Sequence, residues 1–112
     1  MTSYVTTHVL DAARGAPAVG VRVELARLEG ETAVPLAAAV TDADGRTSEL
    51  GPPRLDPGTY RVTFATGEYF RAQDVATFYP RVSVEFLVEA GEEHYHVPCL
   101  LSPYAYSTYR GS

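Results

Sequence analysis

The chain contains 112 residues, of which 46% are hydrophobic and 21% charged, so length and composition predict one globular domain spanning residues 1–112. Nine arginines against fourteen acidic residues give a net charge of −5, which argues against a nucleic-acid partner. The absence of lysine excludes a Schiff base on this chain, and a single cysteine excludes an internal disulfide.

Apolar and polar side chains alternate along most of the chain, which is typical of strands that have one face on a core. Turn-forming residues separate these runs, as in the segment from Asp42 to Gly45. The predicted strands are residues 3–11, 19–28, 35–42, 46–50, 58–66, 81–90, 93–101 and 104–110. Residues 67–76 lack the alternation and predict a short helix before Pro80. The pattern predicts an all-β sandwich with one short helix.

The alternation also predicts which face of each strand carries the histidines. In the strand 93–101, the face predicted to pack on the core carries Tyr95, Val97, Cys99 and Leu101. The opposite face carries His94, His96, Pro98 and Leu100. In the first strand, His8 and Leu10 share the outward face. Histidines beside apolar side chains on an outer face predict a covering ligand or subunit; scattered surface apolar residues are the alternative.

These residue types favour acid–base hydrolysis. Histidine can give or take a proton near neutral pH, and arginine can hold an anionic substrate and stabilise charge developing on oxygen. The histidines of the outward faces are therefore candidates for such a site, together with Arg46 after the Asp42–Gly45 turn and Arg110 near the C-terminus. The alternative is a zinc hydrolase with His8, His94 and His96 as ligands, since three histidines and an open position form a known catalytic zinc arrangement. Cys99 falls on the core face and is predicted to be an inert thiol.

Several motifs resemble the transthyretin superfamily. They are Thr7-His8-Val9-Leu10-Asp11, Asp44-Gly45-Arg46, His94-Tyr95-His96-Val97-Pro98 and Leu101-Ser102-Pro103-Tyr104. The ending Tyr106-Ser107-Thr108-Tyr109-Arg110-Gly111-Ser112 resembles the 5-hydroxyisourate hydrolase branch. The hormone-carrying transthyretins have Lys, Glu and Thr where this chain has His8, Arg46 and His96. One departure is Cys99, where the enzymes usually have an aliphatic residue.

The resemblance implies two four-stranded antiparallel sheets with one short helix. It also implies a homotetramer, a dimer of dimers, with sites at the dimer–dimer interface that share residues from two chains. The implied reaction is hydrolysis of the N1–C6 amide bond of 5-hydroxyisourate to 2-oxo-4-hydroxy-4-carboxy-5-ureidoimidazoline, on the route from urate to allantoin. No cofactor and no metal are expected. A carrier of small aromatic ligands, without catalysis, is the alternative from the same superfamily.

The resemblance also assigns expected roles to residues of this chain. His8 and His96 activate and position the water, with either of them as the general base. Arg46 steadies the negative charge that develops on the substrate. The C-terminal residues Tyr109, Arg110, Gly111 and Ser112 close the site and contact the substrate. His94 is expected to be structural, with its ring satisfied by a neighbour or by water.

The sequence also bears on location. No apolar run reaches the ~18 residues that a membrane-spanning helix needs, so no membrane partner is expected. The first residues, Met1 to Tyr4, lack the basic and apolar regions of a secretory leader. We therefore expect a cytoplasmic protein.

Overall fold

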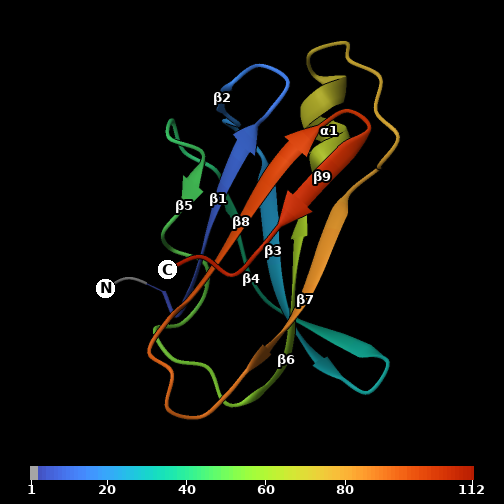
Figure 1. The fold of residues 1–112 in the computed structure, drawn as a ribbon. Helices are drawn as coiled ribbons and strands as arrows, with labels where there is room; N and C mark the ends of the chain where they lie inside the picture. Colours follow the sequence, from blue (N-terminus) through green and yellow to red (C-terminus); the bar gives the residue numbers. More distant parts are fainter. Residues whose placement is uncertain (1–2) are drawn as a thin grey trace.

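The computed structural model describes residues 3–112, so Met1 and Thr2 of the predicted domain lie outside the described residues. Two β-sheets pack face to face (Figure 1). The front sheet consists of β1 (Val5–Asp11), β2 (Ala16–Pro17), β5 (Arg46–Thr47), β8 (Tyr95–Ser102) and β9 (Ala105–Thr108). The back sheet consists of β3 (Arg22–Glu29), β4 (Thr32–Val40), β6 (Gly58–Phe64) and β7 (Val82–Val88). The predicted sandwich class is confirmed.

Strand direction in the front sheet differs from the prediction in one pair. The strand order is β2-β1-β8-β9, with β5 also pairing with β1, and β1 runs parallel to β8. The back sheet is antiparallel throughout, in the order β4-β3-β6-β7. The prediction of entirely antiparallel sheets is therefore wrong for β1 and β8. Alternation reveals which face a side chain takes, but it carries no information on strand direction.

The one helix within residues 3–112, α1 (Thr66–Arg71), is shorter than the predicted 67–76. The chain leaves the helix through turns in which Asp74 adopts a left-handed backbone conformation, with φ of 57°. The helix closes one end of the sandwich, because Tyr69 and Phe70 are buried in the core. The Tyr69 hydroxyl donates a hydrogen bond of 2.8 Å to the Asp11 carboxylate, which ties the helix to the end of β1.

The core confirms the predicted facing of the strand that carries two histidines. Tyr95, Val97, Cys99 and Leu101 are all buried in one apolar cluster with side chains from the back sheet. Burying each large apolar side chain stabilises the fold by about 1.5–3 kcal/mol. Burial also raises the pKa of the Cys99 thiol to about 12, so it stays protonated and inert, as predicted. Within residues 3–112, no helix is long and apolar enough to cross a membrane.

Candidate active site

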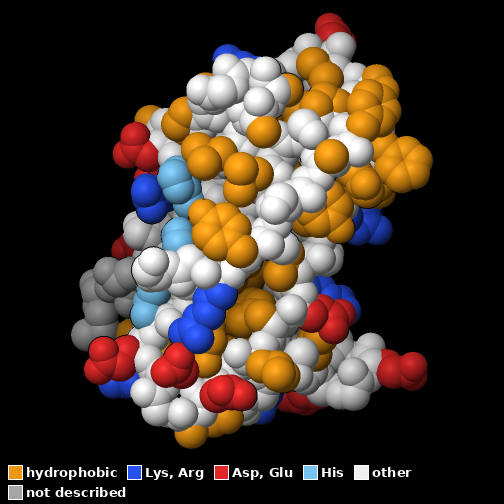
Figure 2. All heavy atoms as spheres, viewed as in Figure 1, with side chains coloured by type: hydrophobic (Ala, Val, Ile, Leu, Met, Phe, Trp, Pro, Cys, Tyr) orange, Lys and Arg blue, Asp and Glu red, His pale blue; other side chains and the backbone are white. Residues whose placement is uncertain are grey.

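Strand register places the predicted catalytic residues on the outer face of the front sheet. His8 of β1 stands opposite Arg46 of β5, and Thr6 stands opposite His96 of β8. Residues directly opposite each other in a sheet share a face, and residues two apart on one strand do so too. His8, Arg46 and His96 therefore lie on one face. Figure 2 shows the three histidines in a column on that face, with charged side chains beside its upper end and apolar side chains along its flank.

A tight turn over residues 42–46 places Arg46 beside His8. The Asp42 carboxylate accepts hydrogen bonds from the backbone N–H groups of Asp44, at 2.8 Å, and Arg46, at 3.0 Å. These bonds hold the pKa of Asp42 below its usual range. Gly45 follows with φ of 76°, and a Cβ atom there would collide with the Val9 carbonyl oxygen. Since the Val9 N–H donates to the Gly45 carbonyl at 2.7 Å, the turn is fastened to β1.

A hydrogen bond to the backbone shows that the Nε2 atom of His8 carries a proton. Its Nε2 atom lies 3.0 Å from the backbone carbonyl oxygen of Asp44. A carbonyl oxygen can only accept a hydrogen bond, so Nε2 carries the proton and donates it. In the neutral ring, the free lone pair of His8 is therefore on Nδ1.

His96 is held in its neutral form. Its pKa is lowered from the ordinary value of 6.5, mainly because burial disfavours the charged ring. The positive charge of Arg46 and the neighbouring rings of His8 and His94 lower it further. Its Nδ1 atom lies 2.8 Å from the Thr6 hydroxyl oxygen. At neutral pH the ring can therefore take up a proton on Nε2.

The C-terminal segment turns back across β8 after β9 (Figure 1) and meets His96. The Gly111 N–H donates to the His96 carbonyl at 2.8 Å, and the Thr108 hydroxyl donates to the Pro98 carbonyl at 2.7 Å. A Cβ atom on Gly111 would lie 2.5 Å from Cδ2 of the His96 ring. The position requires glycine because the ring occupies that space.

Gly111→Ala is therefore expected to displace the His96 ring while leaving the fold intact. We expect kcat to fall about 10²-fold, the usual effect of misplacing one catalytic group. We expect little change in Tm, because the C-terminal segment lies at the surface. Steady-state kinetics and thermal unfolding check both parts. Gly91→Ala is the comparison variant for activity only. Its added methyl group meets nothing within 4 Å, but Gly91 has φ of 91°, so alanine there strains the backbone and should lower Tm. Equal activity losses in the two variants would contradict the ring displacement.

The remaining predicted residues of the C-terminus are less closely joined to the histidines. The Arg110 guanidinium donates to the Glu92 carboxylate at 2.9 Å and lies 4.4 Å from the centroid of the Tyr95 ring. Tyr109 and Ser112 are exposed. The structure thus brings together His8, Arg46, His96 and Gly111. Arg110 pairs with Glu92 and Tyr95, but it also donates to the His94 carbonyl at 3.3 Å and lines, with Tyr109 and His96, a hollow of about 330 Å³.

One polar residue at the site was missed by sequence reasoning. The Thr6 hydroxyl lies 2.9 Å from His94 Nε2 as well as 2.8 Å from His96 Nδ1. Thr6 shares the outer face of β1 with His8, but threonine on a strand carries no chemical signal of its own. In the described part of the chain, no group of three His, Cys, Asp or Glu side chains is placed to hold a metal ion. The nitrogens of His94 and His96 that face each other are instead bridged by Thr6.

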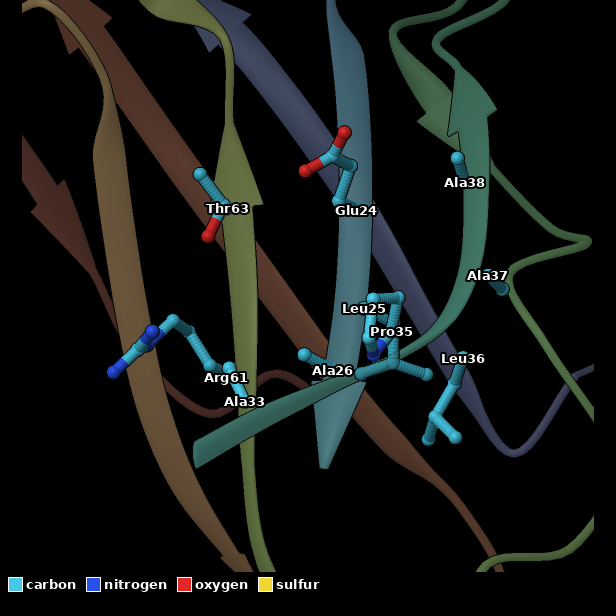
Figure 3. A pocket seen from close by; sticks show the side chains of 10 residues that line it. All are labelled: Glu24, Leu25, Ala26, Ala33, Pro35, Leu36, Ala37, Ala38, Arg61 and Thr63. Atoms are coloured by element: carbon cyan, nitrogen blue, oxygen red, sulfur yellow. The ribbon is translucent and has the colours of Figure 1, made fainter. Parts of the chain in front are cut away.

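A separate hollow of about 470 Å³ lies on the outer face of the back sheet (Figure 3). It forms where the register of β3 and β4 shifts between Leu25 and Ala26. Its lining is mostly apolar and includes four alanines, and its two charged side chains are in ion pairs, Arg61 with Glu85 and Glu24 with Arg22. It offers no histidine, so the groups suited to proton transfer lie on the front sheet.

Comparison with known proteins identifies the family of the chain. A family model described as the HIUase/Transthyretin family matches residues 5–111. A protein of Deinococcus radiodurans named 5-hydroxyisourate hydrolase is 48% identical, over 96% of this chain and 94% of that protein. A mouse protein of the same name is 43% identical, over 99% of this chain and 97% of its own. The solved structure of Klebsiella pneumoniae 5-hydroxyisourate hydrolase has a TM-score of 0.88 and 40% identity, covering 98% of this chain and 99% of that one.

Proposed function

Because the chain belongs to the HIUase/Transthyretin family, we propose that it is an enzyme that hydrolyses 5-hydroxyisourate in urate degradation. The family resemblance inferred from the motifs is confirmed. The observation that carries the activity is the grouping of His8, Arg46 and His96 on one sheet face. At these three positions the motifs resemble the hydrolase branch rather than the hormone carriers, and the ending Arg110-Gly111-Ser112 does so too.

His96 is the general base of the proposed reaction. Its lowered pKa keeps the ring neutral, and Nε2 takes a proton from the attacking water. The water oxygen bonds to C6, and the electron pair of the carbonyl moves onto its oxygen. Arg46 stabilises that negative charge. When the carbonyl re-forms, the C6–N1 bond breaks, and N1 receives the proton from His96, which returns the ring to its neutral form.

His8 orients the water. Its Nε2–H is committed to the Asp44 carbonyl, so the ring is fixed and its free lone pair is on Nδ1. That lone pair accepts a hydrogen bond from the water and leaves the second proton of the water to His96. Two histidines with different hydrogen-bond partners thus take different roles.

The proposed assembly is a homotetramer, a dimer of dimers with its sites where the dimers meet. In the single chain the histidine face is open, and Tyr109 beside it is 58% exposed. A second chain over this face would exclude bulk water and strengthen the electrostatic interactions inside the site. It would also bring Tyr109, Arg110 and Ser112 against the substrate. We place the protein in the cytoplasm, where a lone buried Cys99 suits a reducing compartment.

The test is the ultraviolet decay of freshly made 5-hydroxyisourate, generated by urate oxidase, with and without the protein. We expect fast decay that survives removal of metals by a chelator, because the scheme uses only this chain's side chains. Decay abolished by chelation and restored by Zn²⁺ would contradict the metal-independent mechanism. No acceleration by a folded tetramer would overturn the enzyme and favour a carrier of small aromatic ligands.

A further inference from the structure

The Thr6 hydroxyl joins two histidine rings at the centre of the site. Its oxygen lies 2.9 Å from His94 Nε2 and 2.8 Å from His96 Nδ1, both within hydrogen-bond range. Thr6 is half-buried on β1, directly opposite His96. The proposed hydrolysis uses neither Thr6 nor His94, so this network has no part in it so far.

A hydroxyl group has one proton to donate and two lone pairs that can accept. Within residues 3–112 the Thr6 hydroxyl has no acceptor other than the two rings, so its proton goes to one ring and the other ring donates to it. In one arrangement, Thr6 donates to His94 Nε2 and accepts from His96 Nδ1–H. In the other, Thr6 donates to His96 Nδ1 and accepts from His94 Nε2–H. Only the first leaves Nε2 of a neutral His96 without a proton, because neutral imidazole carries its single proton on one nitrogen.

We propose that Thr6 is a positioning residue which, anchored by His94, holds His96 in the tautomer that has its proton on Nδ1 and a free Nε2. This inference rests on the proposed function, because it takes His96 as the base. The arrangement also suits the charged ring that forms during the reaction. When Nε2 has taken the proton of the water, Nδ1–H continues to donate to the Thr6 oxygen without any rearrangement.

His94 is the anchor because it must accept the Thr6 proton. In a protonated His94 both ring nitrogens carry protons, so Nε2–H would donate to Thr6. The hydroxyl would then donate to His96 Nδ1 and leave the proton of that ring on Nε2. The charged or titratable groups that act on His96 are Arg46 on β5, His8 on β1 and His94 itself. The Thr6 bridge makes His94 part of the site rather than a purely structural residue.

The first experiment measures the tautomer without using activity. In protein labelled with ¹⁵N at histidine, the chain gives ring signals from only three residues. The shifts of the two ring nitrogens report which one carries the proton. We expect His96 in the Nδ1–H form in the substrate-free protein, and a mixture of tautomers in Thr6→Val. A wild-type His96 in the Nε2–H form would overturn the proposal, whatever the activity.

The second experiment measures kinetics. Thr6→Val keeps the shape of the side chain and removes the hydroxyl, and we expect kcat to fall about tenfold, the factor that one net hydrogen bond contributes. We expect KM to stay near the wild-type value, since Thr6 does not touch substrate. His94→Ala should lower kcat by a similar factor. Thr6→Ser keeps the hydroxyl, so its kcat should be close to that of the wild type. Thr63→Val removes a threonine hydroxyl on the back sheet, where it bonds Ser83, and is the matched control.

The outcomes separate this inference from the proposed function. If the protein does not hydrolyse 5-hydroxyisourate but His96 is in the Nδ1–H form, the proposed enzyme function is wrong and the hydrogen-bond arrangement is supported. Hydrolysis with unchanged kcat in both Thr6→Val and His94→Ala would overturn the positioning role and leave the enzyme standing. If Thr6→Val does not fold, the tautomer of His96 in the wild type and the kinetics of His94→Ala still test the positioning role of Thr6.

Discussion

His96→Ala is expected to lower kcat/KM by about 10²–10⁴-fold, the usual contribution of a general base. The variant should keep its fold, because His96 lies on the outer face of β8 while the buried neighbours Tyr95 and Val97 stay in place. The measurement is the initial rate of 5-hydroxyisourate decay, with circular dichroism and Tm as checks on folding. Residual activity above the uncatalysed rate is expected from Arg46 and His8.

His96→Asn is the matched variant for this prediction. An asparagine amide can donate to the Thr6 hydroxyl much as Nδ1–H does, but it has no nitrogen that can take a proton. We expect Asn to be as inactive as Ala, and added imidazole to restore part of the activity of the Ala variant. An Asn variant with activity near the wild type would exclude His96 as the base.

The assignment of His96 as the general base also predicts how kcat/KM changes with pH. The folded pKa of His96 is below 6.5, so the ring remains neutral when the pH falls to that value. The base form, and with it kcat/KM, is lost only as pH drops further through the lowered pKa. An acid limb with its midpoint below pH 6.5 is expected in the wild type. That limb should disappear from the residual activity of His96→Ala.

The face of each strand was predictable from sequence because side chains alternate with a period of two. That rule placed Tyr95, Val97, Cys99 and Leu101 in the core, and the structure confirms all four. It also put His8 and His96 on the outside. Their proximity to Arg46 depended on motifs, since neither alternation nor composition states which strands are neighbours.

Other features lay beyond sequence reasoning for physical reasons. The parallel pairing of β1 with β8 joins the two ends of the chain, and a local pattern carries no signal of it. The Thr6 bridge depends on the register of that same pair, so it appears only once the pairing is known. Arg110 was expected at the substrate because it lies in the C-terminal motif. In the single chain its guanidinium pairs with Glu92 and lies over the Tyr95 ring, beside the His94 carbonyl and in the lining of a hollow that His96 shares.

Arg46→Glu is expected to remove nearly all activity while leaving the fold intact. Loss of one group that stabilises an oxyanion costs about 10²–10³-fold in kcat. A carboxylate in its place also repels the developing negative charge, so the loss should reach at least about 10³-fold. The backbone of residue 46 makes both of its hydrogen bonds with Asp42, and these do not depend on the side chain. The turn should therefore persist, with Tm close to that of the wild type.

A series at position 46 separates charge from shape. Lysine keeps the positive charge but lacks the planar fork of arginine, and glutamine keeps a donor without charge. We expect activity to fall in the order Arg, Lys, Gln, Glu. Arg61→Glu makes the same charge change on the back sheet, in an exposed ion pair with Glu85 that contributes about 0–1 kcal/mol. If Arg61→Glu lowered the rate as much as Arg46→Glu, the effect would be one of overall charge, and Arg46 would have no role at the reacting oxygen. A selective loss at position 46, graded with charge, places the guanidinium where negative charge develops.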